Sequence, residues 1–504
     1  MNNNAKTTLP NIVWLVQDHV TWKHYRDTAG PKPKLETYER IASRGVAFDR
    51  ARTVVPLCSP ARACMLTGMY PHKHGITRND DKSWRKRFAE GTKLFNWHLQ
   101  QRGYRTGYFG KWHAGAGVPA DFGFEGFSLP GYGNPYRSPE YAAYLQRYGL
   151  PDPIVDVEWA AGGPAVKNVN MKDVVRFAGV NPNGFRSASA GVMKAPAEAS
   201  EAFFVSQLAC DWLEQAAADG SPFMLRVDVW GPHQPYLVAE PFKDTIDPRG
   251  IPEYPNFSHT FEDRPQYHRR DREEWRRRTG FNSWEQWQPI VARAYEHFAQ
   301  TDAALLKVLD TLERLGLSGN TIVIYTADHG DILGSGGGLF DKDSMLTEET
   351  MSIPLAVYWP GVTERPRTSD ALVSNMDIVP TVLEMAGAEV PADMDGRSIL
   401  PLLRQDRPGD WREDLMAQHF GHKNYDGIQR VLYYKHYKYV AHADDSDELY
   451  DLERDPFERN NLIHDASMKA VLEEMQTRLA ARMSEYGDVS EPSRALLAQK
   501  RIAH

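Results

Sequence analysis

The chain has 504 residues, 41% apolar and 25% charged, with a formal net charge of −8. This composition supports a large core in two or more domains, or in one large domain with an appendage, and the negative charge gives no reason to expect a nucleic-acid partner. No apolar run reaches the length that crosses a membrane. The N-terminus lacks a signal-like apolar segment, and the three cysteines, Cys58, Cys64 and Cys210, imply no disulfide framework, so we expect a bacterial cytoplasmic protein.

Short apolar segments alternate with helix-like segments through most of the chain. The strand-like segments are 11–16, 47–48, 222–227 and 321–326, and the helix-like segments are 35–42, 201–217 and 287–315. This alternation predicts an α/β fold with a large, mostly parallel or mixed sheet sandwiched by helices. Segments 119–153 and 162–183 are rich in phenylalanine, glycine and proline, and we predict long loops there that shape a pocket.

The pattern changes after about residue 406. Strand-like segments at 430–434, 437–441 and 448–452 precede a helix-like segment at 466–485. They predict a smaller C-terminal subdomain with an antiparallel sheet and one helix. We therefore expect a large α/β domain over residues 1–405, an α+β subdomain over 406–488 and a C-terminal arm over 489–504, for which contact with another subunit of a homo-oligomer is one role.

Carboxylates follow two of the predicted strands. Asp18 and His19 come after the segment 11–16, and Asp328 and His329 come after 321–326. Ligands collect beyond the carboxyl ends of strands in open α/β sheets, so the two pairs could converge there. Oxygen ligands with an imidazole suit a divalent cation such as Ca²⁺, Mg²⁺ or Mn²⁺. The alternative is that each aspartate only caps the next helix.

Cys58 opens the segment Cys58-Ser59-Pro60-Ala61-Arg62 and precedes a helix-permissive stretch. A free cysteine is often simply buried, which is the alternative reading. At a helix N-terminus, however, the backbone dipole favours negative charge on a nucleophile or a bound anion. We therefore interpret Cys58 as a nucleophile site.

Four segments together resemble the type I sulfatases of the alkaline phosphatase superfamily. They are VVPLCSPARACMLTGMYPHKHGI (54–76), GYFGKWH (107–113), DVWGPHQPY (228–236) and TADHGDILGSGGGL (326–339), the last followed by Phe340-Asp341-Lys342. The likeness covers residues 11 to about 462. It implies that a formylglycine-generating enzyme oxidises Cys58 to formylglycine, whose hydrate attacks the sulfate ester.

The same resemblance implies roles for individual residues. The implied metal ligands are Asp18, Asp328, His329 and the modified Cys58, with His19 as a further candidate, although many sulfatases carry an aspartate at that place. The cation is expected to be Ca²⁺, with Mn²⁺ and Mg²⁺ as alternatives. The implied catalytic residues are Arg62, Lys111 and Lys342 for positive charge, His233 or Lys342 for protonation of the leaving alcohol, and His113 for release of sulfate. Asn79 lies close enough in sequence to bind a sulfate oxygen.

The expected activity is hydrolysis of an aryl or small alkyl sulfate ester. A phosphonate monoester or phosphodiester hydrolase of the same superfamily is the closest alternative, and a catalytically inactive anion-binding relative is another. Lys111 and His113 favour the sulfatase, since the phosphonate hydrolases considered lack the Lys-Trp-His segment. A serine or threonine nucleophile is disfavoured because neither residue occupies position 58.

Overall fold

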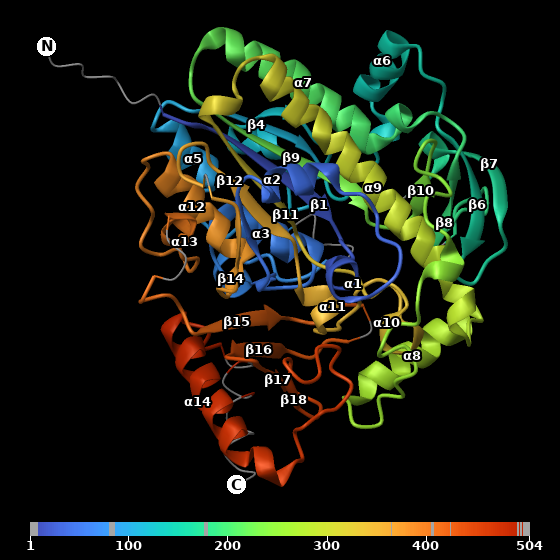
Figure 1. Ribbon diagram of the computed structural model, residues 1–504, viewed down its shortest axis with the longest axis vertical. Helices are drawn as coiled ribbons and strands as arrows, with labels where there is room; N and C mark the ends of the chain where they lie inside the picture. The colour runs from blue at the N-terminus through green and yellow to red at the C-terminus, as the bar shows by residue number, and fades with distance from the viewer. Residues whose placement is uncertain are drawn as a thin grey trace, which may run out of the picture.

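A computed structural model describes residues 9–79, 86–175, 180–363, 365–404, 408–423, 425–490, 493 and 496. An eight-stranded sheet lies at its centre (Figure 1). Its strands, in spatial order, are β13 (Arg367–Ser369), β2 (Val46–Phe48), β12 (Leu355–Tyr358), β11 (Thr321–Ala327), β1 (Asn11–Asp18), β9 (Phe223–Pro232), β4 (Arg105–Gly110) and β5 (Glu125–Phe127). Strands β11, β1, β9, β4 and β5 are parallel, and β12 runs antiparallel between β11 and β2. The prediction of a large, mostly parallel sheet is confirmed.

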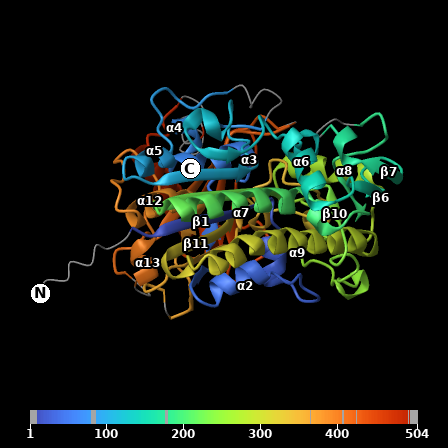
Figure 2. The same ribbon diagram turned by 90° about the horizontal axis from the view of Figure 1, so that it is seen from above.

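Helices cover both faces of this sheet, as the view from above shows (Figure 2). The α-helices are α1 (Trp22–Asp27), α2 (Glu36–Ala42), α3 (Cys58–Thr67), α4 (Pro71–His74), α5 (Phe95–Gln100), α6 (Pro139–Tyr148), α7 (Glu201–Asp219), α8 (Gln266–Thr279), α9 (Trp284–Arg314), α10 (Ser335–Gly338), α11 (Glu348–Met351), α12 (Ile378–Met385), α13 (Leu400–Arg404) and α14 (Lys469–Glu485). Within the described residues, no helix has the length and apolar character needed to span a bilayer.

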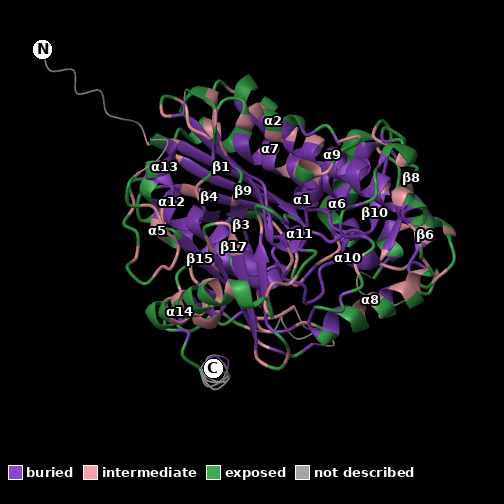
Figure 3. Cartoon of the chain, turned by 60° about the horizontal axis from the view of Figure 1, so that its bottom comes forward, coloured by how far each residue is buried: buried purple, intermediate pink, exposed green. Residues whose placement is uncertain are grey.

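Alternate residues of β1 face two different apolar clusters. Val13 and Leu15 pack with α2, α7 and α9, whereas Ile12, Trp14 and Val16 pack with α5 and α12. The whole strand is buried, and the sheet lies under helices whose outer faces are exposed (Figure 3). A strand buried on both faces needs a continuous apolar run, which explains why β1 and β11 were recognisable in the sequence.

The two predicted loops were wrong in part, because both contain regular elements. Segment 119–153 contains α6, whose first turn is capped by the hydroxyl of Ser138, and segment 162–183 contains strand β7 (Val166–Asn170). Strand β7 joins a second sheet of order β10 (Tyr236–Val238), β8 (Ser189–Met193), β6 (Ile154–Ala160) and β7. Tyrosines form much of the buried face of α6 and β7 is mostly exposed, so neither shows a simple apolar period.

A separate four-stranded antiparallel sheet follows near the C-terminus, as predicted. It consists of β15 (Asp414–His419), β16 (Gln429–Tyr434), β17 (Tyr437–His442) and β18 (Glu448–Asp451), with α14 alongside. A further two-stranded sheet pairs β3 (Ala51–Arg52) with β14 (Val373–Ser374). Strand β15 was not predicted. The expected boundary at residue 405 lies outside the described residues, as does most of the expected arm. Two described residues of this arm, Ser493 and Leu496, contact the C-terminal sheet of the same chain. Arg430 of that sheet donates a hydrogen bond to the hydroxyl of Ser493.

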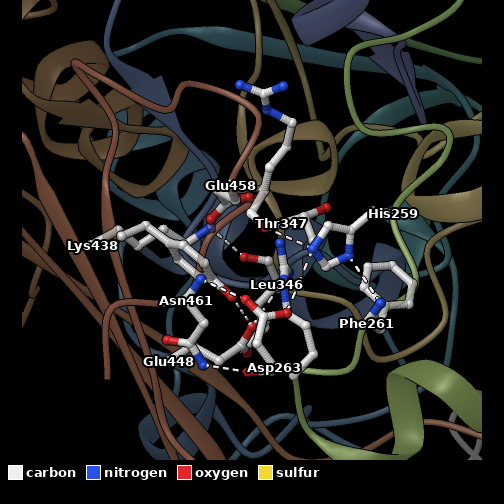
Figure 4. A network of polar contacts seen from close by, with 12 residues as sticks. His259, Phe261, Asp263, Leu346, Thr347, Lys438, Glu448, Glu458 and Asn461 are labelled. Carbon is white, nitrogen blue, oxygen red and sulfur yellow. Dashed lines mark hydrogen bonds and ion pairs between the residues drawn. The ribbon is translucent and has the colours of Figure 1, made fainter. Parts of the chain in front are cut away.

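The C-terminal sheet binds the large domain through apolar packing and a buried polar network. Its core merges with Val54 and Leu57, which precede α3. In the polar network (Figure 4), Lys438 pairs with Glu458 at 2.7 Å within the subdomain and also donates to the carbonyl of Leu346 in the large domain. At the surface, the N–H of Asn461 donates to the Asp263 carboxylate at 2.7 Å. The contacts with Leu346 and Asp263 join the C-terminal subdomain to the large domain.

Candidate active site

Cys58 lies at the first position of α3, as the sequence predicted, and its side chain is buried. Its Sγ is 3.1 Å from Nε2 of His329. The Nδ1 of His329 lies 2.9 Å from the carbonyl oxygen of Gly330. That oxygen can only accept, so Nδ1 carries a proton, and Nε2 is the ring nitrogen that faces Cys58.

Asp18 and Asp328 converge at adjacent strand ends beside Cys58. One ligand atom from each of Asp18, Cys58, Asp328 and His329 lies within 4.8 Å of the others. Asp328 Oδ1 accepts from the backbone N–H groups of His19 and His329. Among the described residues, Asp18 Oδ1 and Asp328 Oδ2 are buried and accept no hydrogen bond. Two carboxylate oxygens that accept no hydrogen bond, with an imidazole nitrogen on the same side, fit a divalent cation, since a buried carboxylate oxygen without a hydrogen bond is costly.

Arg62 runs alongside the same carboxylates. Its Nε is 3.0 Å from Asp328 Oδ2 and its Nη2 is 3.7 Å from Asp18 Oδ1, but neither contact has the geometry of a hydrogen bond. Its Nη1 donates to Asp228 at 2.7 Å and to the carbonyl of Lys111 at 2.9 Å. The guanidinium is therefore held from Asp228, so its position does not depend on the two carboxylates that face Cys58.

Lys111 reaches Asp18 directly after strand β4. Its Nζ forms a buried ion pair with Asp18 Oδ2, and its N–H donates to the carbonyl of Asp228 at 2.8 Å. Gly110 makes this approach feasible. It has a φ of +111°, and a Cβ at this position would lie 1.9 Å from the carbonyl oxygen of Asp228. The glycine of the Gly-Lys-Trp-His segment thus lets β4 close on β9 just before Lys111.

The surroundings of Cys58 favour negative charge. Burial alone would raise the pKa of the thiol, but Lys111, Lys342 and His329 outweigh it and hold the pKa well below its ordinary value. By contrast, burial raises the pKa of Cys64, six residues further along α3. Position 58 is therefore an anion site within a helix where the neighbouring cysteine is an ordinary buried thiol.

His113 and Asn79 both lie beside the start of α3. His113 is in hydrogen-bond contact with Cys58, and burial lowers its pKa to about 4. Asn79 Oδ1 accepts from the N–H of Ser59 at 2.7 Å. Its amide NH₂ is then the group with which it can donate to an anion. Both predicted residues are thus beside Cys58.

His19 lies in a neighbouring cluster rather than among the four candidate ligands. One ligand atom from each of His19, His233 and Asp341 lies within 4.8 Å of the others. The ring of His19 is centred 4.7 Å from that of His233, and its Nε2 is 3.5 Å from both Asp331 and Asp341. His19 is therefore not among the four candidate ligands beside Cys58, although its own cluster is also a group that could hold a metal ion, and its metal role stays a prediction.

Lys342 is buried beside Asp341, and the C-terminal subdomain reaches the same carboxylate. Lys342 Nζ donates to Asp341 Oδ1 at 2.8 Å, while Lys423 Nζ donates to Oδ2 at 3.0 Å and also pairs with Asp343. Burial lowers the pKa of Lys342, but Asp341 and Cys58 raise it well above its ordinary value. Lys342 is therefore a fixed cation near position 58.

Sequence reasoning assigned no role to three residues at this site. Asp228 accepts a hydrogen bond from Arg62 and two from Arg226, at 2.7 and 2.9 Å. The sequence pattern that could have identified Asp228 is an acidic and a basic residue two positions apart, on one face of a buried strand. Lys423 comes from the C-terminal subdomain, and Tyr132 from a glycine-rich loop. Their segments have no pattern that points to the site, because only tertiary contacts bring them there.

The chain matches the family model described as Sulfatase over residues 10–388, and the model described as N-sulphoglucosamine sulphohydrolase, C-terminal, over residues 336–485. It is 25% identical over 488 residues to the ulvan-active sulfatase of Formosa agariphila. That alignment covers 95% of this chain and 82% of the relative.

Two solved structures share the fold. A protein in complex with its substrate D-glucosamine-2-N,6-O-disulfate has a TM-score of 0.71 and 22% identity, over 96% of this chain and 99% of that one. A phosphonate monoester hydrolase of Silicibacter pomeroyi has a TM-score of 0.73 and 19% identity, over 95% and 96%.

Proposed function

The chain belongs to the sulfatase family of sulfuric ester hydrolases, and on that premise we propose that it hydrolyses a sulfate monoester of a ring alcohol through a formylglycine made from Cys58. The observation that carries the proposal is the position of Cys58. It lies at the first turn of α3, between Lys111, Lys342 and His329 and beside two carboxylates with unpaired oxygens. An encoded thiol needs no such set of cations and metal ligands.

The residues that would hold a divalent cation are Asp18, Asp328, His329 and the modified position 58. When bound, the cation would supply Lewis-acid charge, and the formylglycine hydrate would supply the attacking hydroxyl. The hydrogen bond from His329 Nδ1 to Gly330 leaves Nε2 as the ring nitrogen on this side. We propose Ca²⁺ as the bound cation, with Mn²⁺ and Mg²⁺ as alternatives, because the donor atoms are mostly hard oxygens.

The remaining residues serve the sulfuryl group and the two proton transfers. Lys111, Lys342 and the Asn79 amide surround the place where sulfate oxygens would lie beside Cys58, so they offset charge that develops there. His233 is assigned to protonate the leaving alcohol, because Lys342 is already committed to Asp341. His113, in contact with Cys58, is assigned to accept the proton that must leave before sulfate is released.

A phosphonate monoester hydrolase is the second candidate. Its support is the TM-score of 0.73 with the Silicibacter pomeroyi enzyme, slightly above the 0.71 with the sulfated-glucosamine complex. A phosphonate monoester carries one negative charge, as a sulfate monoester does, so net charge does not separate them. The retention of Lys111 and His113, of which His113 is in hydrogen-bond contact with Cys58 and Lys111 pairs with Asp18 beside it, favours the sulfate ester.

The direct test is sulfate release by protein produced together with a formylglycine-generating enzyme. We expect the peptide that holds Cys58 to weigh less than encoded, by the difference between a thiol and an aldehyde, and an aryl sulfate to be hydrolysed. Cys58→Ala should abolish turnover without lowering the melting temperature appreciably. Cys64→Ala is the matched control and should keep both modification and turnover. Near-normal turnover by Cys58→Ala would rule out the nucleophile.

A further inference from the structure

A surface cavity of about 340 Å³ adjoins the catalytic residues. This volume falls in the range of small-molecule sites in proteins. Its lining residues are Pro130, Gly131, Tyr132, Gly133, Asn134, Arg137, Val174 and Val175. They come from two segments, 130–137 and 174–175, both within stretches for which the sequence predicted pocket-forming loops. Nothing in the mechanism above uses this cavity.

The ring of Tyr132 lines the cavity and also contacts catalytic residues. Lys111 Nζ lies 4.1 Å from the ring centroid. The rings of His113 and His233 meet Tyr132 edge-on, with centroids at 5.4 and 5.5 Å. Three residues assigned to sulfate and to proton transfer thus touch the same side chain that lines the cavity.

Both walls of the cavity are held by specific hydrogen bonds. The indole N–H of Trp230, on β9, donates to the carbonyl of Tyr132. Asn134 Nδ2 donates to the carbonyl of Val174 at 2.8 Å, which ties the two lining segments together. Arg137 donates from Nε to the carbonyl of Lys172 at 2.6 Å, which fixes its exposed guanidinium at the rim. The cavity is therefore a built feature of the fold.

The lining determines what fits. Pro130, Val174 and the Tyr132 ring offer apolar contact, and Val175 exposes 46% of its surface at the rim. Among the lining residues that the structure describes, Arg137 is the only charged one. A flat ring would gain contact along the apolar surfaces, and an acidic group on that ring would face the guanidinium, which binds carboxylate and sulfate alike.

We propose that this cavity is the leaving-group subsite, in which Tyr132 supports the ring of the departing alcohol and Arg137 selects a ring that carries a second acidic group. The proposal rests on the proposed sulfatase activity and names its substrate class: a ring alcohol sulfate with an additional carboxylate or sulfate. The ester oxygen then lies toward His233 and His113, on the inner side of Tyr132.

The test compares two esters, 4-nitrophenyl sulfate and 2-carboxy-4-nitrophenyl sulfate. Arg137→Ala should lower kcat/KM for the carboxylated ester about fivefold, mainly through KM, which is the size expected for a partly exposed charge pair. The uncharged ring should change less than about twofold. Arg137→Lys should give a kcat/KM for the carboxylated ester between those of wild type and Arg137→Ala. Arg147→Ala, at an exposed position on nearby α6, is the matched control and should leave kcat/KM unchanged for both esters. Tyr132→Leu should slow both esters, whereas Tyr132→Phe keeps the ring and should slow them less.

A binding measurement separates failure of the subsite from failure of the proposed function. By calorimetry, the product 2-hydroxy-5-nitrobenzoate should bind Cys58→Ala protein more tightly than protein that also carries Arg137→Ala. Equal effects of Arg137→Ala on both esters, or equal product binding, would overturn the subsite while leaving the sulfatase intact. If wild-type protein hydrolyses neither ester yet binds the product through Arg137, the proposed function fails and only the binding of an acidic ring at this cavity stands.

Discussion

At the scale of single residues, Asp18 and Asp328 each keep one buried oxygen outside any hydrogen bond in the described part of the chain. Burial, with a smaller contribution from the neighbouring Asp18, raises the pKa of Asp328 to about 6, so the charged form of this carboxylate needs positive charge nearby. A divalent cation would supply that charge.

Asp328→Asn should therefore cost at least about three orders of magnitude in turnover, because metal binding and nucleophile activation are lost together. Chelation of the wild-type protein should remove activity, and readdition of the cation should restore it. Elemental analysis should find one divalent metal per chain in wild type and less in the variant. Asp302→Asn, a buried aspartate on α9, is the control that should keep the metal. Active protein without divalent metal would contradict the assignment.

His113 is expected to act after the alcohol has left. In His113→Ala the first alcohol should still be released, because His233 and Lys342 remain, whereas sulfate release should slow by about a hundredfold, the usual size of a general-base effect. Rapid mixing should then show a burst of about one alcohol per enzyme before a slow steady rate. An equal slowing of the first turnover would assign His113 to the earlier step instead.

The candidate site was predictable where chemistry lies at the end of a buried strand or at the start of a helix. Asp18, Asp328, His329 and Cys58 satisfy that description, and the structure brings them within 4.8 Å. Tyr132, Asp228 and Lys423 do not. Their contribution depends on contacts between segments far apart in the chain, which no local pattern encodes.

At the scale of elements, the central strands were predicted because both faces are buried, so each is a continuous apolar run. Helix α6 was missed because its buried positions include Tyr141 and Tyr144 rather than aliphatic residues alone. Its start could have been found from Ser138 and Pro139, since serine before a proline is a typical helix N-terminus.

Helix α8 provides a test of stability against pH. His268 is buried and, within the described residues, neither ring nitrogen forms a hydrogen bond. Burial lowers its pKa from 6.5 to about 3, with Glu448 opposing and Arg264, His442 and His259 adding to the effect. Because the folded pKa is depressed, the contribution of this residue to stability is complete above pH 6.5 and is lost as the pH falls toward 3.

His268→Phe should therefore flatten the pH dependence of the free energy of unfolding between pH 6.5 and 5, by up to about 1.4 kcal/mol per pH unit. Urea unfolding at several pH values measures this slope. The exposed His464→Phe is the control and should leave the slope unchanged. An unchanged slope in His268→Phe would show that this histidine does not resist protonation in the folded state.

At the scale of the whole molecule, the C-terminal sheet contributes to the site as well as to the fold. Its polar network with the large domain places Lys423 against Asp341, which also binds Lys342. The sheet and helix of this subdomain were predictable from the change in sequence pattern after about residue 406. Its docking was not, because the contacts include buried ion pairs such as Lys438 with Glu348, whose partners cannot be matched from one sequence.

We propose that this site acts on a sulfate ester in preference to a phosphonate ester. Because both esters carry one negative charge, the choice must come from how Lys111, His113 and Lys342 surround position 58. The most direct measurement is kcat/KM for an aryl sulfate and for the matching phenylphosphonate ester, on the same formylglycine-containing protein. We predict a higher value for the sulfate. A clear preference for the phosphonate would contradict the assignment of this site to sulfate esters.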